Sequence, residues 1–84
     1  MVFFIYILKS RQNGKYYIGS TNDLDDRIKR HNEGRSKYTK SGIPWDLVYY
    51  EEHPDRSSAV NREQKIKSRK SKDYLESLVR TSRL

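Results

Sequence analysis

Residues 2–20 read VFFIYILKSRQNGKYYIGS, and this stretch decides the fold. The run from Val2 to Leu8 is apolar on both faces and rich in β-branched and aromatic residues, which predicts a strand covered on both sides. The pair Asn13 and Gly14 is a strong signal for a tight turn between antiparallel strands. Because residues 16–20 resume the strand pattern, the sequence predicts a β-hairpin as its first element.

Capping residues and apolar periodicity predict the remaining elements. Asn22, Ser57 and Ser71 are expected to cap three helices, and Gly34 is expected to end the first. The predicted strands lie at about 2–9, 15–20 and 45–51, and the predicted helices at about 23–33, 57–68 and 71–80. We therefore expect an α/β (α+β) fold in which a three-stranded antiparallel sheet is flanked by helices, as a single domain over residues 1–84.

Composition narrows the cellular setting. A chain of 84 residues has room for one modest core. It has no cysteine, so it can form neither a disulfide framework nor a thiolate metal site, which suits a reducing compartment. The longest apolar run has seven residues, which is too short to span a membrane, and no basic region precedes it as in a signal peptide. We expect a cytoplasmic protein.

The net charge of +7 favours polyanionic partners. Much of the excess lies in residues 62–84, where eight basic residues stand against three acidic ones. The same charge run also fits an ordinary solvated helical surface. Other features must therefore decide whether these residues bind a polyanion or only face solvent.

Polar residues interrupt the core stripe of the first predicted helix. Leu24, Arg27, Ile28 and His31 fall on one helical face, and two of the four are polar. A buried guanidinium costs several kcal/mol, as an order of magnitude, unless an anion meets it. The stripe therefore indicates an anion site, although a snorkelling Arg27 and a hydrogen-bonded boundary His31 explain it equally well.

The second predicted helix has a similar interruption. Ala59, Glu63 and Ile66 share one face, which turns a carboxylate toward the protein. One carboxylate can hold Mg²⁺ when substrate phosphate and water complete its shell. The alternative is a salt bridge to Lys67 or Arg27, which the residues alone favour.

Two tyrosines share the predicted hairpin. Tyr6 and Tyr17 lie on its two strands, and Gly19 leaves a gap beside Tyr17 that could admit a phosphate. Both can also be ordinary strand residues. Tyrosine, with a pKa of about 10, becomes a base at neutral pH only when a cation such as Arg27 favours its phenolate or another group relays the proton.

In this order the residues resemble the GIY-YIG nuclease family. Phe4-Ile5-Tyr6 stands at the first signature, with Phe4 in place of glycine, and Tyr17-Ile18-Gly19 is the second signature intact. Arg27, His31 and Glu63 follow at the expected places, so that the resemblance covers nearly the whole chain. Within that family, the chain is similar to the small single-domain bacterial members named for the YhbQ protein.

The resemblance implies hydrolysis of a phosphodiester in one metal-assisted step. Glu63 would hold Mg²⁺ or Mn²⁺, and Arg27 would neutralise charge on the phosphoryl oxygens. Both signature tyrosines qualify as the base, with Tyr6 favoured and Tyr17 orienting or relaying. His31 would bond to the phosphate, the water or a tyrosine hydroxyl. The products would carry a 5′-phosphate and a 3′-hydroxyl.

The resemblance also implies a nucleic-acid partner, DNA before RNA, held by phosphate contacts that weaken with salt. The residues expected at this contact are Gly19, Arg35, Lys37, Thr39, Lys40, Lys67, Arg69 and Lys70. Larger family members add DNA-reading domains, so we expect low sequence specificity here, with selectivity for branched or single-stranded structure as one form. The competing hypothesis is a weakly catalytic or non-catalytic binding module that acts with a partner. A purely structural domain has least support, because it leaves the polar constellation unexplained. The oligomeric state stays open, with a monomer as one possibility.

Overall fold

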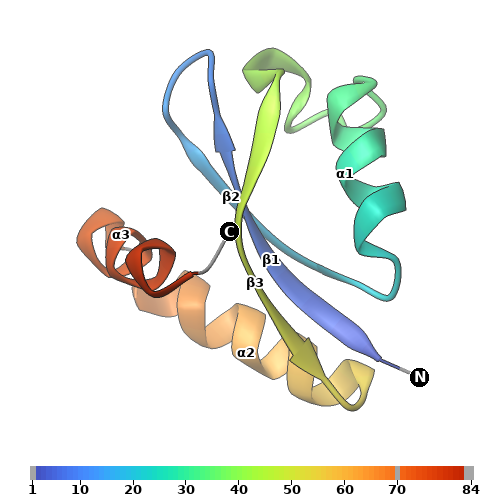
Figure 1. The fold of residues 1–84 in the computed structure, drawn as a ribbon, viewed down its shortest axis with the longest axis vertical. Coiled ribbons are helices and arrows are strands. Elements are labelled where there is room, and N and C mark those ends of the chain that lie inside the picture. The colour runs from blue at the N-terminus through green and yellow to red at the C-terminus, as the bar shows by residue number, and fades with distance from the viewer. Residues whose placement is uncertain (1, 70, 83–84) are drawn as a thin grey trace.

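The computed structural model describes residues 2–69 and 71–82. The central strand β1 (Phe3–Ser10) pairs antiparallel with β2 (Tyr16–Thr21) on one side and β3 (Trp45–His53) on the other, giving the sheet order β2-β1-β3. Helix α1 (Leu24–Asn32) covers one face, and helices α2 (Arg56–Arg69) and α3 (Lys72–Thr81) cover the other (Figure 1). The predicted α+β fold is confirmed.

Strand β1 separates two small cores. Its side chains from Ile5 to Leu8 are all fully buried, as the doubly apolar sequence predicted. Ile5 packs with Ala59 and Ile66 of α2, whereas Tyr6 packs with Leu8 and with Trp45 of β3 under α1. Because side chains alternate across a strand, neighbouring residues of β1 serve opposite faces of the sheet. Tyr6 thereby faces α1.

The hairpin turn and the C-terminal helix follow the sequence prediction. Gly14 has φ +73, the left-handed conformation that an Asn-Gly turn needs. Ser71 caps α3 by accepting a hydrogen bond from the backbone of Tyr74. Leu75 and Leu78 of α3 then pack on the core of the α2 side. These features are local in sequence, which is why they could be predicted.

The predicted caps of the first two helices are wrong by one or two residues. The first was predicted one residue too early and the second two residues too late. Asp23, not Asn22, caps α1, because its backbone is extended and its carboxylate accepts from Asp26 N at 3.1 Å. Asp55, not Ser57, takes the corresponding place at α2, where its carboxylate accepts from Ser58 N at 2.8 Å. The helix therefore begins at Arg56. Adjacent residues with equal capping ability make such boundaries hard to predict.

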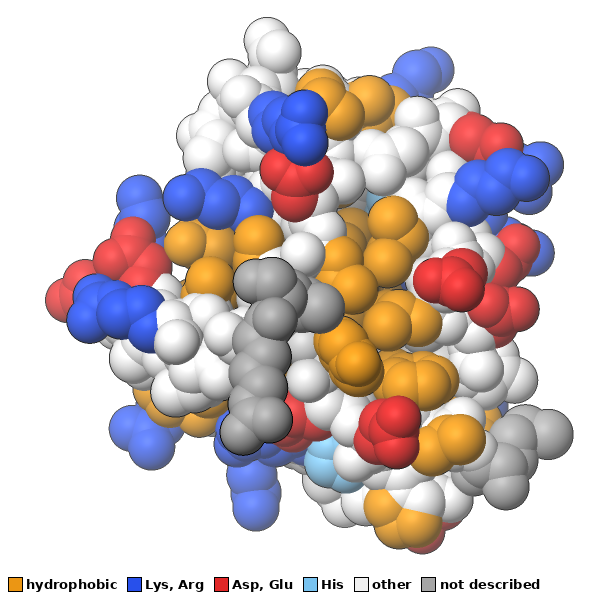
Figure 2. Space-filling model, in the orientation of Figure 1, with side chains coloured by type: hydrophobic (Ala, Val, Ile, Leu, Met, Phe, Trp, Pro, Cys, Tyr) orange, Lys and Arg blue, Asp and Glu red, His pale blue; other side chains and the backbone are white. Residues whose placement is uncertain are grey.

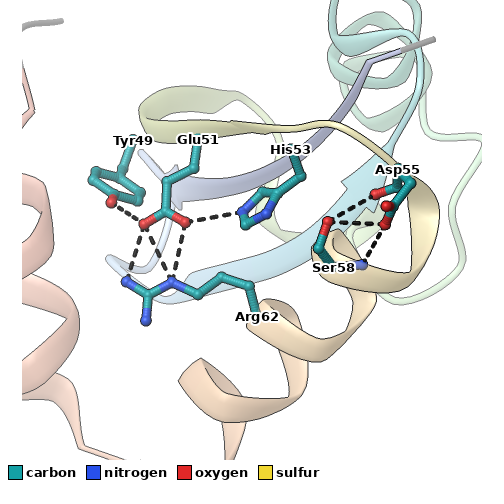
Figure 3. A network of polar contacts seen from close by, with 6 residues as sticks. All are labelled: Tyr49, Glu51, His53, Asp55, Ser58 and Arg62. Carbon is teal, nitrogen blue, oxygen red and sulfur yellow. Dashed lines mark hydrogen bonds and ion pairs between the residues drawn. The ribbon is translucent and has the colours of Figure 1, made fainter.

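A polar network ties β3 to α2 (Figure 3). Both Nε and a terminal nitrogen of Arg62 donate to the Glu51 carboxylate, at 3.0–3.3 Å, while Tyr49 and His53 bond to the same carboxylate from either side along β3. Burial alone would raise the pKa of Glu51, but these hydrogen bonds, first that of Arg62, outweigh it and lower the pKa. The network fixes α2, the helix that carries Glu63, against the sheet.

Charged side chains of both signs are scattered over the surface in Figure 2. On the face drawn in Figure 2, hydrophobic side chains gather in the middle, and Lys and Arg lie mainly toward the periphery, several beside Asp or Glu. Over the described residues of this face, the basic side chains do not merge into one surface. Net charge alone therefore does not locate a nucleic-acid contact. None of the helices in the described part of the chain is both long and apolar enough to cross a membrane.

Candidate active site

A buried chain of hydrogen bonds runs from β1 through α1 to the loop that follows it. The Tyr6 hydroxyl lies 3.0 Å from His31 Nε2, and His31 Nδ1 lies 2.8 Å from the Thr39 hydroxyl. All three residues are at most 2% exposed. Of the roles open to His31, the structure shows the bond to a tyrosine hydroxyl, since both ring nitrogens are occupied within the protein.

Asn32 and Trp45, which stand before and after the loop that precedes β3, hold this loop in place by hydrogen bonds. The Asn32 side chain accepts from Trp45 N at 2.6 Å and donates to Trp45 O at 3.1 Å. The Trp45 indole in turn donates to Thr39 O at 2.7 Å. These bonds join the end of α1, the loop and the start of β3, and they set Thr39 directly behind His31. Buried polar groups fully paired in this way rigidify a site.

The pattern of bonds indicates which nitrogen of His31 carries the proton. Burial first, and the nearby charge of Arg27 second, lower the pKa of His31, so the ring is neutral at pH 7. The Thr39 hydroxyl has Ser36 O as a longer acceptor at 3.5 Å. If it donates there, it accepts from His31 Nδ1–H, and the bare Nε2 then accepts from Tyr6. Each hydroxyl or ring N–H then donates to the next residue in the series, so that the hydrogen bonds all run from Tyr6 toward Thr39.

The charged groups of the site act electrostatically on the Tyr6 hydroxyl. Burial, and then the neighbouring Tyr17 and Glu63, raise the pKa of Tyr6, while the charge and hydrogen bonding of Arg27 oppose the rise. Two residues from opposite faces of the sheet, Arg27 of α1 and Glu63 of α2, thus act on one phenol. Tyr6 stays protonated at neutral pH in this arrangement.

Arg27 borders two cavities. One, of about 180 Å³, is lined by Tyr17, Arg27, Arg30, His31, Arg35 and Ser36. The other, of about 310 Å³, lies between the end of β2, α1 and the start of α2. The interruption of the first helical stripe is therefore real: Leu24 and Ile28 pack on the core, whereas Arg27 reaches cavities that are open to ligand.

Glu63 lies at the edge of the site and carries a partner. Its side chain is 14% exposed, and Lys67 Nζ lies 2.6 Å from Glu63 Oε2 on the same helix. The salt bridge to Lys67 considered from the sequence is present. Because Lys67 is itself 46% exposed, its side chain can leave the carboxylate at little cost when another cation approaches.

The two signature tyrosines differ in accessibility. Tyr6 is 0% exposed, so its phenol does not meet solvent, while Tyr17 is partly exposed and lines the smaller cavity with Arg27. The rings of Tyr17 and His31 pack at 4.8 Å between centroids. The preference for Tyr6 as the group that meets the attacking water does not fit this burial. Of the two, Tyr17 is the tyrosine that lines a cavity.

Gly19 has a different role from the one expected. It pairs with Tyr6 across the sheet, and a Cβ there would lie 2.6 Å from the Tyr6 hydroxyl. The expected gap for a phosphate is therefore filled by the Tyr6 ring. Only glycine lets the phenol lie against β2.

The remaining expected nucleic-acid contacts fall into three groups. Thr39 is fully buried, so direct contact with a nucleic acid is wrong for its side chain. The second group consists of exposed cations, namely Arg35, Lys37, Lys40, Lys67 and Arg69. Three of them already have partners: Arg35 pairs with Glu33, Lys67 pairs with Glu63, and Arg69 stacks on Tyr74. Lys70 lies outside the described residues.

Comparison with known proteins identifies the family of the chain. The family described as the GIY-YIG catalytic domain matches residues 2–75 of the chain. The chain belongs to the GIY-YIG family. A UPF0213 protein of Staphylococcus epidermidis is 41% identical over 66 residues, covering 77% of this chain and 79% of that protein, and one from Staphylococcus aureus matches equally.

A solved structure extends the GIY-YIG comparison to the fold. The solution NMR structure of the UPF0213 protein BH0048 from Bacillus halodurans aligns with a TM-score of 0.62 at 35% identity, covering 98% of this chain and 86% of that one. The chain is thus one of the small UPF0213-like GIY-YIG proteins, in which the sheet and helices described above recur.

Proposed function

We propose that this chain is a metal-dependent endonuclease that hydrolyses phosphodiester bonds in DNA with low sequence specificity. The observation that supports this most is the cavity that Arg27 shares with Tyr17 and His31. It adjoins Tyr6, whose hydroxyl bonds to His31 and whose pKa responds to the charges of Arg27 and Glu63. A cation, a carboxylate and a phenol drawn from three elements form a set that phosphodiester hydrolysis can use. Membership of a nuclease family supports the same reaction class.

The residues at Glu63 fit a hard divalent ion bound weakly by protein. Among residues 2–69 and 71–82, no three His, Asp or Glu side chains gather as a ligand set. We propose Glu63 as the protein ligand, with substrate phosphate and water completing the shell, an arrangement that suits Mg²⁺ or Mn²⁺. Such an ion, when bound, polarises the scissile phosphate and stabilises the leaving oxygen.

The other residues take roles that their positions support. Arg27 stabilises charge developing on the phosphoryl oxygens. Tyr17 contacts the attacking water, because this residue lines the cavity that Arg27 borders. It takes the proton of the water while it passes its own hydroxyl proton to a phosphoryl oxygen of the substrate. Tyr6 and His31, held by Thr39, position the ring of Tyr17 from behind. Hydrolysis in this sense leaves a 5′-phosphate and a 3′-hydroxyl.

Binding would rest on phosphate contacts by exposed cations such as Arg35, Lys37 and Lys40. Contacts of this kind read charge and backbone shape, so selectivity for branched or single-stranded DNA is the form of specificity we propose. RNA is the second substrate to test. The lack of cysteine suits the reducing cytoplasm, where we propose that the chain acts.

A second candidate function is favoured by one observation. The ion pair between Lys67 and Glu63 neutralises the carboxylate on which metal binding depends. A domain in which this pair persists would bind nucleic acid through Arg27 and its neighbours without cutting it. The two functions differ in one respect only, which is whether a divalent ion displaces Lys67.

The test compares labelled supercoiled, single-stranded and branched DNA, and RNA, in Mg²⁺, Mn²⁺ or EDTA. The parent should cut at least one substrate with either metal and none in EDTA. Arg27→Ala and Glu63→Ala should abolish cutting, while Glu52→Ala, an exposed carboxylate on β3, should not. Equal cutting by all variants would place the reaction elsewhere, and binding without cutting would support the second function.

A further inference from the structure

The larger of the two cavities beside Arg27 has the composition of an anion site. It occupies about 310 Å³ and is lined by Phe3, Ser20, Thr21, Asn22, Arg27, Arg56 and Val60. Its lining therefore contains two guanidinium groups, several hydrogen-bonding side chains and no carboxylate. Phe3 and Val60 add a small apolar wall, of the kind against which a sugar can lie.

The two arginines of this cavity stand apart from the others. Most described arginines are already engaged: Arg11 with Asp46, Arg30 with Asp26, Arg35 with Glu33, Arg62 with Glu51 and Arg69 with the Tyr74 ring. Within residues 2–69 and 71–82, no carboxylate pairs with Arg27, Arg56 or Arg80. Two of these three border one cavity, where their like charges repel until an anion lies between them.

The position of Arg56 is also unfavourable for the helix that carries it. Arg56 is the first residue of α2, and although the carboxylate of Asp55 caps the helix just before it, the first turn itself contains no acidic residue. A cation at a helix N-terminus opposes the macrodipole. Residues that break a local rule without a structural gain mark functional positions more often than others. Arg56 was not predicted as a site residue because the helix was expected to begin after it.

The cavity lies next to the proposed reaction centre. Arg56, Val60 and Glu63 share one face of α2, and Glu63 lies seven positions after Arg56, which is about 10 Å along the helix axis. Arg27 closes the opposite side and also borders the Tyr17 cavity. A strand whose scissile phosphate lies at Arg27 and Glu63 would pass a neighbouring phosphate into this space.

We propose that this cavity is a second phosphate subsite, which holds a non-scissile phosphate of the strand being cut, with Arg56 as its main ligand. Arg27 lies between the two phosphates and contacts both. The inference rests on the proposed function, which it deepens by giving the substrate strand a path across the protein. It also makes Arg56 a determinant of affinity instead of a participant in the chemistry.

The test measures binding of a fluorescent single-stranded DNA in EDTA, where no cutting occurs, at several salt concentrations. Each phosphate contact on a single strand contributes about 0.7 to the slope of log affinity against log salt. Arg56→Gln should lower the slope by about 0.7. The matched control is Arg80→Gln, at an exposed arginine of α3 that pairs with no carboxylate of the described residues, and it should leave the slope unchanged. An unchanged slope in Arg56→Gln, or an equal fall in both variants, would overturn the subsite.

A second measurement locates the anion. Titration with inorganic phosphate should shift the backbone amide signals of Ser20 and Thr21 in the parent and much less in Arg56→Gln. Arg56→Gln should fold normally, because it removes a cation from the N-terminus of a helix. Equal shifts in parent and variant would contradict the proposal. Since neither measurement needs cleavage, a parent that binds by this site but cuts nothing would refute the proposed function and leave the subsite standing.

Discussion

Replacing Thr39 by valine removes the inner end of the buried chain. Valine keeps the shape of threonine but lacks the Oγ1 that lies 2.8 Å from His31 Nδ1. Thr39 is 0% exposed and His31 is 2% exposed, so solvent does not readily replace the lost partner. The substitution therefore leaves a buried N–H group without an acceptor.

The expected cost follows from that unpaired group. A buried polar group left unsatisfied costs about 1–3 kcal/mol. In a domain of this size each 1 kcal/mol lowers the thermal midpoint by roughly 4–8 °C. Thr39→Ser keeps the hydroxyl and loses one methyl group, which costs about 1 kcal/mol. Thermal unfolding alone therefore separates the two variants only partly.

Nitrogen NMR of the His31 ring gives the sharper readout. In the parent and in Thr39→Ser, the proton should reside on Nδ1, with Nε2 accepting from Tyr6. In Thr39→Val this preference should be lost, and cleavage should slow without a rise in KM, since no group that contacts substrate has changed. A valine variant with the parent's midpoint, ring protonation and rate would refute the role of Thr39.

Three further predictions concern neighbouring groups. Tyr6→Phe should lower the thermal midpoint, because it removes the partner of a buried His31 nitrogen. Tyr17→Phe should abolish cleavage and leave the midpoint nearly unchanged. The reverse pattern would exchange the roles of the two tyrosines. The free energy of unfolding should fall as the pH is lowered through about 6.5, by at most about 1.4 kcal/mol per pH unit. The reason is that the pKa of folded His31 is depressed, so that the unfolded chain takes up the proton first. Urea titrations at several pH values should show that His31→Gln loses this dependence. Glu51→Gln should cost about 1–3 kcal/mol in chemical denaturation by leaving Arg62 without its carboxylate, and a cost near zero would mean that the network does not fix α2.

The parts of the fold that could be predicted are those with local causes. The turn at Gly14 and the doubly buried strand β1 each follow from a few consecutive residues. The polar interruptions at Arg27 and Glu63 were visible because helical periodicity is itself local. Their shared influence on the pKa of Tyr6 follows from the placement of α1 and α2 on the two faces of a three-stranded sheet.

What could not be predicted depends on loops and on single-residue boundaries. Thr39 reads as an exposed loop residue in the sequence, and only the Asn32 and Trp45 bonds turn it inward behind His31. Arg56 escaped prediction because the helix start was placed after it. Gly19 suggested an open space, but the ring across the sheet occupies it. Long-range packing decided each case.

In the proposed function, Glu63 supports metal-dependent cleavage of a phosphodiester. The most direct measurement is the single-turnover rate on one end-labelled DNA substrate in Mg²⁺ for the parent and Glu63→Gln, with Glu52→Gln as the matched control. The parent and the control should yield products with 5′-phosphate ends at the same rate, and Glu63→Gln should yield none above the EDTA background. Cleavage by Glu63→Gln at the parent's rate would contradict the account.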